Sequence, residues 1–257
     1  MSVLYNNIVF GPIVSRRFGS SLGINLLPLQ NKVCNFNCIY CECGWTDLKS
    51  NKIKYLGSSE IITAIENRFK VLKKEKIHID SITFAGNGEP TMHPKFSEII
   101  DAVIQLRDIY LPKIKITVLS NSTLLGNKSV FESLKKIDLR VMKLDAGNTD
   151  MLKKIDKPLS SKTIEWYIEK LKELNGELII QTIFLKGYCD GVYVDNTTTD
   201  ELSSWLNAIK EINPKSVMIY TIDRETPADK LEKISAKTLN SICDQVLANG
   251  INANVYT

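Results

Sequence analysis

Four cysteines lie within ten residues in the first fifth of the chain, and three of them have a spacing that suits a metal centre. The segment Cys-Asn-Phe-Asn-Cys-Ile-Tyr-Cys places Cys34, Cys38 and Cys41 in a C-x3-C-x2-C pattern. Three thiolates on a short loop can hold three irons of a cubane cluster, and the fourth iron then keeps an open position for a substrate or a second cofactor. The pattern predicts a [4Fe-4S] cluster with these three cysteines as its ligands.

The fourth cysteine of the group, Cys43, leaves an alternative open. A structural zinc site needs four ligands and Cys43 could complete one, although zinc cysteines usually come as two separated pairs. If the loop had a helical trend, Cys43 would point away from the face shared by the other three. We therefore expect Cys43 not to be a ligand, and we expect Cys189 and Cys243 to be buried thiols.

Length and composition indicate an ordinary globular protein. The chain has 257 residues, of which 44% are hydrophobic and 24% charged, and its net charge is +4. No segment approaches the roughly 18 consecutive apolar residues of a membrane span, and the first residues do not resemble a signal peptide. We expect a cytoplasmic protein with reduced cysteines and no membrane partner. The charge permits a nucleic-acid partner but is weaker than the basic surface that phosphate backbones usually require.

Short apolar segments alternate with amphipathic helical patterns. Strands are predicted at residues 22–28, 80–85, 113–120, 138–145, 177–187 and 215–222. Helices are predicted at residues 59–74, 94–106, 128–136, 162–174, 200–212 and 236–248, with an irregular loop before the fourth of them and a last short strand at 252–256. Six strand–helix units with apolar strands favour an α/β fold, a partial (β/α)6 TIM-like barrel of parallel strands. We expect one domain over residues 1–257, with residues 1–21 as an N-terminal extension that packs near the cluster.

Polar and glycine-rich segments follow the predicted strands. The carboxyl ends of parallel barrel strands meet at one rim, and active sites of this architecture lie there. After the cysteine loop, the segments at this rim are residues 86–90, 120–123, 144–147, 186–191 and 223–227. We therefore expect the chemistry to take place at this edge of the sheet.

The C-x3-C-x2-C pattern, with the aromatic Tyr40 directly before the third cysteine, resembles the radical S-adenosylmethionine (radical SAM) superfamily. The resemblance implies that S-adenosylmethionine binds the open iron and that the reduced cluster cleaves it to a 5′-deoxyadenosyl radical, which abstracts hydrogen from a substrate. In such enzymes the cofactors carry the hard chemistry while the protein orients them and excludes water. The resemblance to the superfamily also implies a flavodoxin or ferredoxin-type reductant as a partner.

The same resemblance implies which residues contact S-adenosylmethionine. The segment at residues 86–89 corresponds to the glycine-rich segment near the methionine amino group, although Gly-Asn-Gly-Glu stands here where many relatives have paired glycines. We expect its glutamate to lie on the open rim. The fifth and sixth strands resemble those that hold the adenine. The cofactor-binding residues expected in this way are Tyr40, Gly86, Asn87, Gly88, Glu89, Ser120, Asn121, Asp145, Gln181, Tyr220, Thr221 and Ile222.

Two further segments resemble one branch of the superfamily. Residues 10–28 (FGPIVSRRFGSSLGINLLP) resemble the opening of the wyosine-synthase-like iron–sulfur oxidoreductases, and residues 223–228 resemble a later segment of that branch. The chain departs from wyosine synthases because no cysteine precedes Cys34 to hold a second cluster. Small members of the branch include enzymes that resemble queuine lyase, which acts in queuosine salvage and converts the free base queuine to aminomethyl-deazaguanine.

We therefore expect a small 7-deazaguanine-like substrate, whose guanine-like edge needs a carboxylate as acceptor. The candidate catalytic residues are Asp47, Asp145, Asp223, Glu225, Arg16 and Arg17. Three alternatives stay open: a tRNA-modifying enzyme of the wyosine-synthase type, a radical SAM activase that acts on a partner protein, and a non-enzymatic zinc- or cluster-binding module.

Overall fold

A computed structural model of the chain describes residues 3–46 and 53–257. The strands are β1 Val9–Ser15, β2 Gly19–Ile24, β3 Ser81–Phe84, β4 Lys115–Ser120, β5 Leu139–Lys143, β6 Ile179–Cys189, β7 Val192–Asp195, β8 Ser216–Thr221, β9 Lys230–Lys233 and β10 Ala253–Tyr256. The helices are α1 Ser58–Glu75, α2 Phe96–Tyr110, α3 Lys128–Lys135, α4 Thr149–Ile155, α5 Ile164–Lys172, α6 Thr199–Ile212 and α7 Ala236–Ala248, with a short 3-10 turn, η1, at Pro90–Met92.

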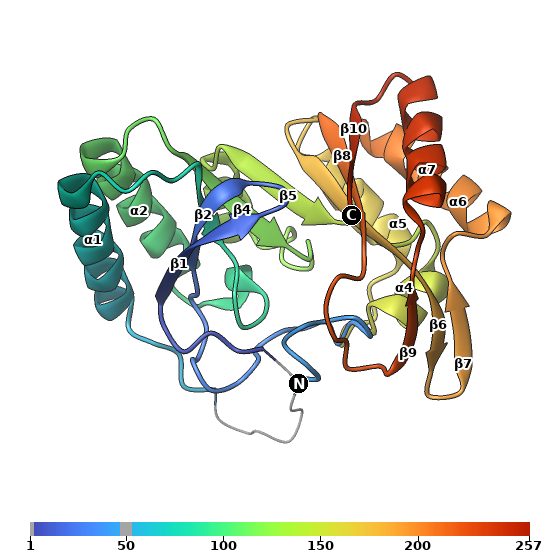
Figure 1. Ribbon diagram of the computed structural model, residues 1–257, viewed down its shortest axis with the longest axis horizontal. Helices are drawn as coiled ribbons and strands as arrows, with labels where there is room; N and C mark the ends of the chain where they lie inside the picture. Colours follow the sequence, from blue (N-terminus) through green and yellow to red (C-terminus); the bar gives the residue numbers. More distant parts are fainter. Residues whose placement is uncertain (1–2, 47–52) are drawn as a thin grey trace.

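The strands form one curved sheet in the order β1-β2-β3-β4-β5-β6-β8-β10. Every neighbouring pair from β2 to β10 is parallel, and only β1 runs antiparallel to its neighbour. Figure 1 shows the helices outside this sheet, with α1 and α2 near one end and α6 and α7 near the other. The expected α/β partial barrel of parallel strands is confirmed, with β10 as an additional parallel strand.

The inside of the barrel changes from apolar to polar toward the carboxyl ends of the strands. Val141, Ile179 and Met218 form a small buried cluster, in which Met218 is the register partner of Gln181. Side chains two residues apart along a strand share a face, so Lys143 and Gln181, which are register partners, follow Val141 and Ile179 on the same side. Polar side chains therefore line the active-site end of the barrel, and apolar side chains precede them along the strands.

The N-terminal extension and two other segments differ from the predicted elements. Part of residues 1–21 forms β1 and the start of β2, a hairpin that joins the sheet. The expected loop before α5 contains α4, whose first turn is capped by the Asn148 side chain. Beyond the barrel, β6 continues and pairs on both sides with β7 and β9. These elements are short or irregular, so periodicity over a long window did not indicate them.

None of the helices in the described ranges has both the length and the apolar content that a membrane span needs.

Candidate active site

The cysteine loop, residues 31–46, is attached to three separate parts of the fold. Val33 donates its amide hydrogen to the carbonyl of Asn87, at 2.8 Å, beyond the carboxyl end of β3. Ile39 donates to the carbonyl of Ile155 at the end of α4, at 2.9 Å, and accepts from the amide of Ala228, at 3.2 Å. The loop is thus held against the rim of the barrel by backbone hydrogen bonds to segments distant in sequence.

This packing buries Cys38 and partly buries Cys34. Burial raises the pKa of Cys34 to about 12 and the pKa of Cys38 well above its ordinary value. The Cys38 thiol donates to Oδ1 of Asp156, at 3.2 Å, and the ammonium of Lys143 lies 3.8 Å from the Cys38 sulfur. Both thiols are therefore protonated at neutral pH, and a metal that binds them must displace their protons.

Cys41 and Cys43 lie close together at the end of the loop. A hydrogen bond from Cys43 lowers the pKa of the Cys41 thiol, and the charge of Lys32 lowers it further. The Cys43 thiol also donates to the carbonyl of Gly86, at 3.3 Å. Cys41 is therefore the sulfur of this loop that most readily becomes a thiolate.

The glycine segment, residues 86–89, lies directly against the cysteine loop. Gly88 has a φ of 136°, and a Cβ atom there would lie 1.8 Å from the carbonyl oxygen of Val33. Only glycine permits so close an approach of two backbones. The side chain of Asn87 is fully buried and bonds the backbone of Tyr5 and the carbonyl of Pro28. The Asn87 side chain thus fastens the N-terminal segment, and the expected role of Asn87 in cofactor binding stays a prediction.

Glu89 is buried beneath the rim, with 3% of its surface exposed. Its carboxylate accepts hydrogen bonds from the hydroxyl of Ser120, at 2.9 Å, and from the amide of Asn121, at 2.6 Å, at the end of β4. It also accepts from the amide and hydroxyl of Thr91. The expectation that Glu89 stands on the open rim is wrong. A carboxylate accepts hydrogen bonds, and four donors hold this one in its buried position.

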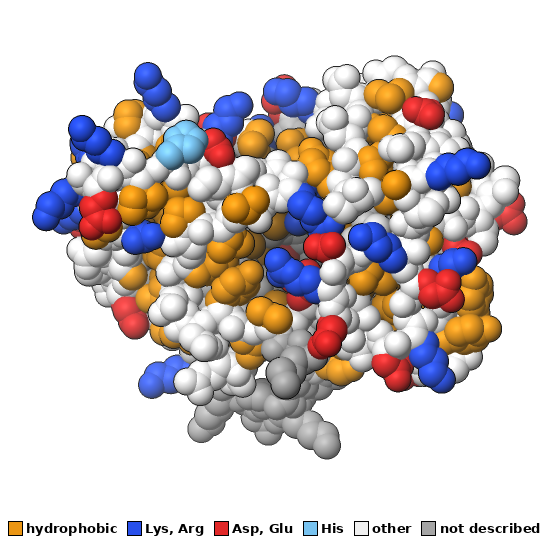
Figure 2. Space-filling model, viewed as in Figure 1, with side chains coloured by type: hydrophobic (Ala, Val, Ile, Leu, Met, Phe, Trp, Pro, Cys, Tyr) orange, Lys and Arg blue, Asp and Glu red, His pale blue; other side chains and the backbone are white. Residues whose placement is uncertain are grey.

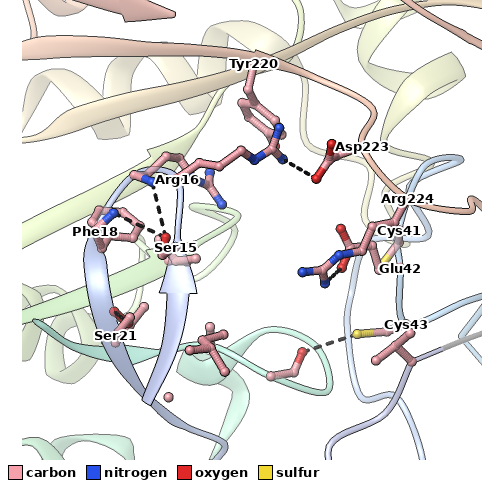
Figure 3. A pocket seen from close by; sticks show the side chains of 18 of the residues that line it. Ser15, Arg16, Phe18, Ser21, Cys41, Glu42, Cys43, Tyr220, Asp223 and Arg224 are labelled. Atoms are coloured by element: carbon pink, nitrogen blue, oxygen red, sulfur yellow. Dashed lines mark hydrogen bonds and ion pairs between the residues drawn. The ribbon is translucent and has the colours of Figure 1, made fainter. Parts of the chain in front are cut away.

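A cavity of about 410 Å³ opens at the mouth of the barrel, between the β1–β2 hairpin, the cysteine loop and the segment after β8. In Figure 3, Arg16 points toward Asp223 and Arg224 points toward Glu42 across this cavity. The ion pairs measure 3.4 Å and 2.6 Å. Figure 2 shows basic and acidic side chains side by side around a hollow in the middle of this face. The cavity wall therefore combines ion-paired side chains with apolar ones, such as Phe10, Phe18 and Ile183.

Arg17 lies deeper than Arg16 and is held by uncharged groups. One guanidinium nitrogen donates to the Gln181 side-chain oxygen, at 2.6 Å, and the guanidinium lies 4.9 Å from the centre of the Tyr220 ring. Arginine has five N–H donors, and among the described residues no carboxylate forms an ion pair with this one. Arg17 therefore presents an oriented cation to the cavity, and Gln181 bonds the barrel interior.

The sequence pattern of the Radical SAM superfamily matches residues 31–192. This chain belongs to the radical SAM superfamily. Members of the superfamily are enzymes, so the fold and the cysteine loop described above are those of a radical SAM enzyme.

Several curated proteins are about one third identical to this chain. A UPF0026 protein of Helicobacter pylori strain J99 is 33% identical, and the match covers 90% of this chain and 71% of the relative. A protein of Brachyspira hyodysenteriae that carries the name GTPase Obg is 34% identical over 93% of this chain, which spans only 32% of that relative's length.

Several solved structures have the same fold at low sequence identity. A radical SAM methyltransferase from Sphaerobacter thermophilus has a TM-score of 0.66 at 16% identity, over 91% of this chain and 65% of that one. The structure named native anSMEcpe with bound AdoMet has a TM-score of 0.60 at 16% identity, over 91% and 63%. Archaeal TYW1 has a TM-score of 0.51 at 13% identity, over 89% and 72%. At this identity the likeness shows the fold alone.

The cysteine loop suits the iron–sulfur cluster that the superfamily implies. Cys34, Cys38 and Cys41 are free cysteines on one loop at the rim. Over the described ranges, no three Cys, His, Asp or Glu side chains are placed to hold one metal ion, as a mononuclear zinc would require. A cubane cluster instead bonds each thiolate to a different iron, so its ligands need not meet at one point.

The residues expected at the site fall into two groups. Those that line the cavity are Arg16, Arg17, Tyr40, Gly86, Tyr220, Thr221, Ile222 and Asp223. Those that lie outside its lining are Asn87, Gly88, Glu89, Ser120, Asn121, Asp145, Gln181 and Glu225. Asn121 lies near the cysteine loop instead, with its side-chain amide nitrogen 3.7 Å from the Cys34 sulfur. Asp47 falls outside the described residues.

Two buried residues beside the cysteine loop were not expected from the sequence. The ammonium of Lys143 contacts the Tyr40 hydroxyl and lies 3.2 Å from Asp145 and 3.6 Å from Asp156. Burial opposes its charge, but the two carboxylates and the Cys38 sulfur outweigh that effect and raise the pKa of Lys143. Lys143 could have been found from the sequence, because it is a charged residue on an apolar strand, two residues before Asp145. No sequence signal indicated Asp156, because α4 was not predicted.

We expect Glu89→Ala to destabilise the protein even without cofactors. The change leaves buried donors at Thr91, Ser120 and Asn121 without an acceptor, and the free energy of unfolding should fall by about 1–3 kcal/mol. Urea unfolding of the cofactor-free protein measures the loss. The control Glu169→Ala removes an exposed carboxylate from α5 and should stay within about 0.5 kcal/mol of the original protein. Equal unfolding curves for both variants would contradict the structural role of Glu89.

Proposed function

We propose that this radical SAM enzyme abstracts hydrogen from a small nucleobase-like substrate, of the 7-deazaguanine class, and that a queuine lyase reaction is its specific activity. Cys34, Cys38 and Cys41 hold a four-iron cluster in this proposal, and Cys43 does not. The cluster and S-adenosylmethionine, when bound, supply the radical that abstracts hydrogen. A flavodoxin or ferredoxin-type protein is the proposed source of the electron.

The residues proposed to bind S-adenosylmethionine lie at the rim, next to the cysteine loop. Tyr40 and Gly86 line the cavity from the side of the loop, and residues 220–222 line it from the end of β8. Ser120 and Asn121 lie at the end of β4, and Glu89 fixes both of them. The role proposed for Glu89 is therefore to position the cofactor-binding segments rather than to touch the cofactor.

The observation that carries the substrate proposal is the charge pattern of the cavity. Its volume of about 410 Å³ is that of a small-molecule site. Arg16 and Arg224 are each paired with a carboxylate, so the wall offers donors and acceptors with little excess positive charge. A flat, uncharged heterocycle with its own donors and acceptors suits such a wall, whereas a chain of phosphates would need several unpaired cations and the described lining offers one, Arg17. Arg17 and the Tyr220 ring add one oriented donor set and one aromatic surface.

The ligand assignment predicts different outcomes for neighbouring cysteines. Cys34→Ala, Cys38→Ala and Cys41→Ala should each prevent assembly of the cluster, because an iron loses its thiolate. Cys43→Ala is the matched control and should keep the iron, the sulfide and the brown colour after anaerobic reconstitution. Visible absorbance and iron analysis of the four variants compare them directly. Loss of the chromophore in Cys43→Ala would contradict the assignment.

Asp223 is the proposed acceptor for the guanine-like edge. We expect Asp223→Asn to lower kcat/KM for the free base about ten- to hundred-fold, since a hydrogen bond to a charged group contributes about 1.5–3 kcal/mol. Cleavage of S-adenosylmethionine without substrate should be unchanged. Glu225→Gln is the control, because that side chain is exposed and outside the cavity lining. A smaller loss for Asp223→Asn than for Glu225→Gln would remove Asp223 from the site.

A direct comparison of substrates distinguishes a free base from tRNA. The protein is incubated anaerobically with S-adenosylmethionine, a reductant and either queuine or tRNA, and the products are identified by mass spectrometry. We expect turnover of the free base, with binding that changes little between low and physiological salt. Binding to tRNA through several phosphates would weaken steeply as salt rises. Salt-sensitive binding of tRNA without turnover of queuine would favour the tRNA-modifying alternative.

A further inference from the structure

Lys32 is a buried cation in the cysteine loop whose charge the described part of the protein does not balance. Only 8% of its surface is exposed, and its ammonium donates a hydrogen bond to the carbonyl of Gly44 at 2.7 Å and interacts with the Cys41 sulfur. No aspartate or glutamate among the described residues forms an ion pair with it. A buried charge is costly unless an opposite charge accompanies it. Among the described residues, the opposite charge would have to come from the sulfurs of the cysteine loop.

The groups that can become anions beside this ammonium are the sulfurs of the loop. Lys32 precedes Cys34 by two residues, and Gly44, which accepts its hydrogen bond, donates its own amide to the carbonyl of Cys41 at 2.8 Å. Its bond to Gly44 keeps the ammonium at the place where the loop turns back past Cys41 and Cys43. The cation is thus fixed next to two of the three proposed cluster ligands.

Lys143, the other buried lysine near a cluster cysteine, provides a comparison. Its ammonium lies within 3.6 Å of two buried carboxylates, Asp145 and Asp156, so the protein already balances its charge. Lys32 has no such partners in the described ranges. The two lysines therefore differ in function: Lys143 belongs to a neutralised network, whereas the charge of Lys32 remains available to the cluster.

We propose that Lys32 is the counter-charge of the iron–sulfur cluster and raises its reduction potential. The inference rests on the proposed function, in which Cys34, Cys38 and Cys41 hold that cluster. Reduction adds one electron, from a flavodoxin or ferredoxin-type donor, and forms or breaks no covalent bond. A fixed positive charge nearby lowers the free energy of the more negative, reduced state. Lys32 would thus assist electron transfer to the cluster, the step that precedes cleavage of S-adenosylmethionine.

Three variants separate the charge of Lys32 from its hydrogen bond. Lys32→Arg keeps a cation, whereas Lys32→Gln keeps an N–H donor for the Gly44 carbonyl but removes the charge. A second cavity, of about 850 Å³, is lined by Lys32, Cys34 and the exposed Lys54, so Lys54→Gln is the matched control. Each protein is reconstituted anaerobically, and the fraction of reduced cluster is followed by electron paramagnetic resonance during a redox titration.

We expect Lys32→Gln to lower the ratio of reduced to oxidised cluster about ten-fold at a fixed potential, which for one electron is a shift of about 59 mV to more negative values. Lys32→Arg and Lys54→Gln should leave the midpoint close to that of the original protein. An unchanged midpoint in Lys32→Gln would overturn the proposal. So would an equal shift in Lys32→Arg and Lys32→Gln, because the geometry of the Gly44 bond would then explain it.

Iron and sulfide analysis keeps the test decisive if Lys32→Gln does not assemble a cluster. Retention of iron by Lys32→Arg and its loss from Lys32→Gln, with equal thermal melting of the two cluster-free proteins, would support the counter-charge. Loss of iron from both variants with unchanged melting would overturn it. Failure of the original protein to bind iron would instead contradict the proposed function, and the same analysis shows this before any variant is made.

Discussion

The backbone contact between the cysteine loop and the glycine segment is the constraint on which the rest of the site depends. Val33 donates to the carbonyl of Asn87 and accepts from the amide of Glu89, at 2.8 and 3.0 Å, so Gly88 is enclosed between them. This contact fixes the loop that carries the sulfurs relative to β3. Through the carboxylate of Glu89 it also fixes the end of β4. The backbone of residues 87–89 thus sets the positions of both the cysteine loop and the rim.

The buried ionisable groups near the cysteine loop form a network whose charge balance depends on the protonation of the Cys38 thiol. Lys143, Asp145, Asp156 and the Cys38 thiol share one enclosed space, and one oxygen of Asp156 has no hydrogen-bond partner there. Burial is the main reason that the pKa of Asp156 is raised, and the charge of Asp145 adds to it. In the proposed ligand assignment, the Cys38 thiol gives up its proton to bind iron, which changes the charge balance of the whole group. The network around Cys38 would then be electrically coupled to the cluster.

Much of the fold could be predicted from the sequence because the barrel elements carry strong periodic patterns. The apolar stripe Ile61, Ile65, Phe69 and Leu72 of α1 is buried as its spacing indicates. The residues that the sequence did not reveal depend on tertiary packing: the burial of Glu89 follows from donors brought in by η1 and β4, and the role of Asn87 follows from Tyr5, which is 82 residues away. Local patterns hold no information about such partners.

The cavity and the cysteine loop hold their charges in two different arrangements. At the cavity, Arg16 and Arg224 are matched by Asp223 and Glu42, and Arg17 has no carboxylate partner among the described residues. At the loop, the ammonium of Lys32 is enclosed, bonds the carbonyl of Gly44 and interacts with the Cys41 sulfur. In the proposed function, the paired wall selects a substrate by its hydrogen bonds, and the fixed charge of Lys32 acts on an electron a short distance away. The tight packing of the loop between Gly86 and Ala228 keeps these two environments adjacent but distinct.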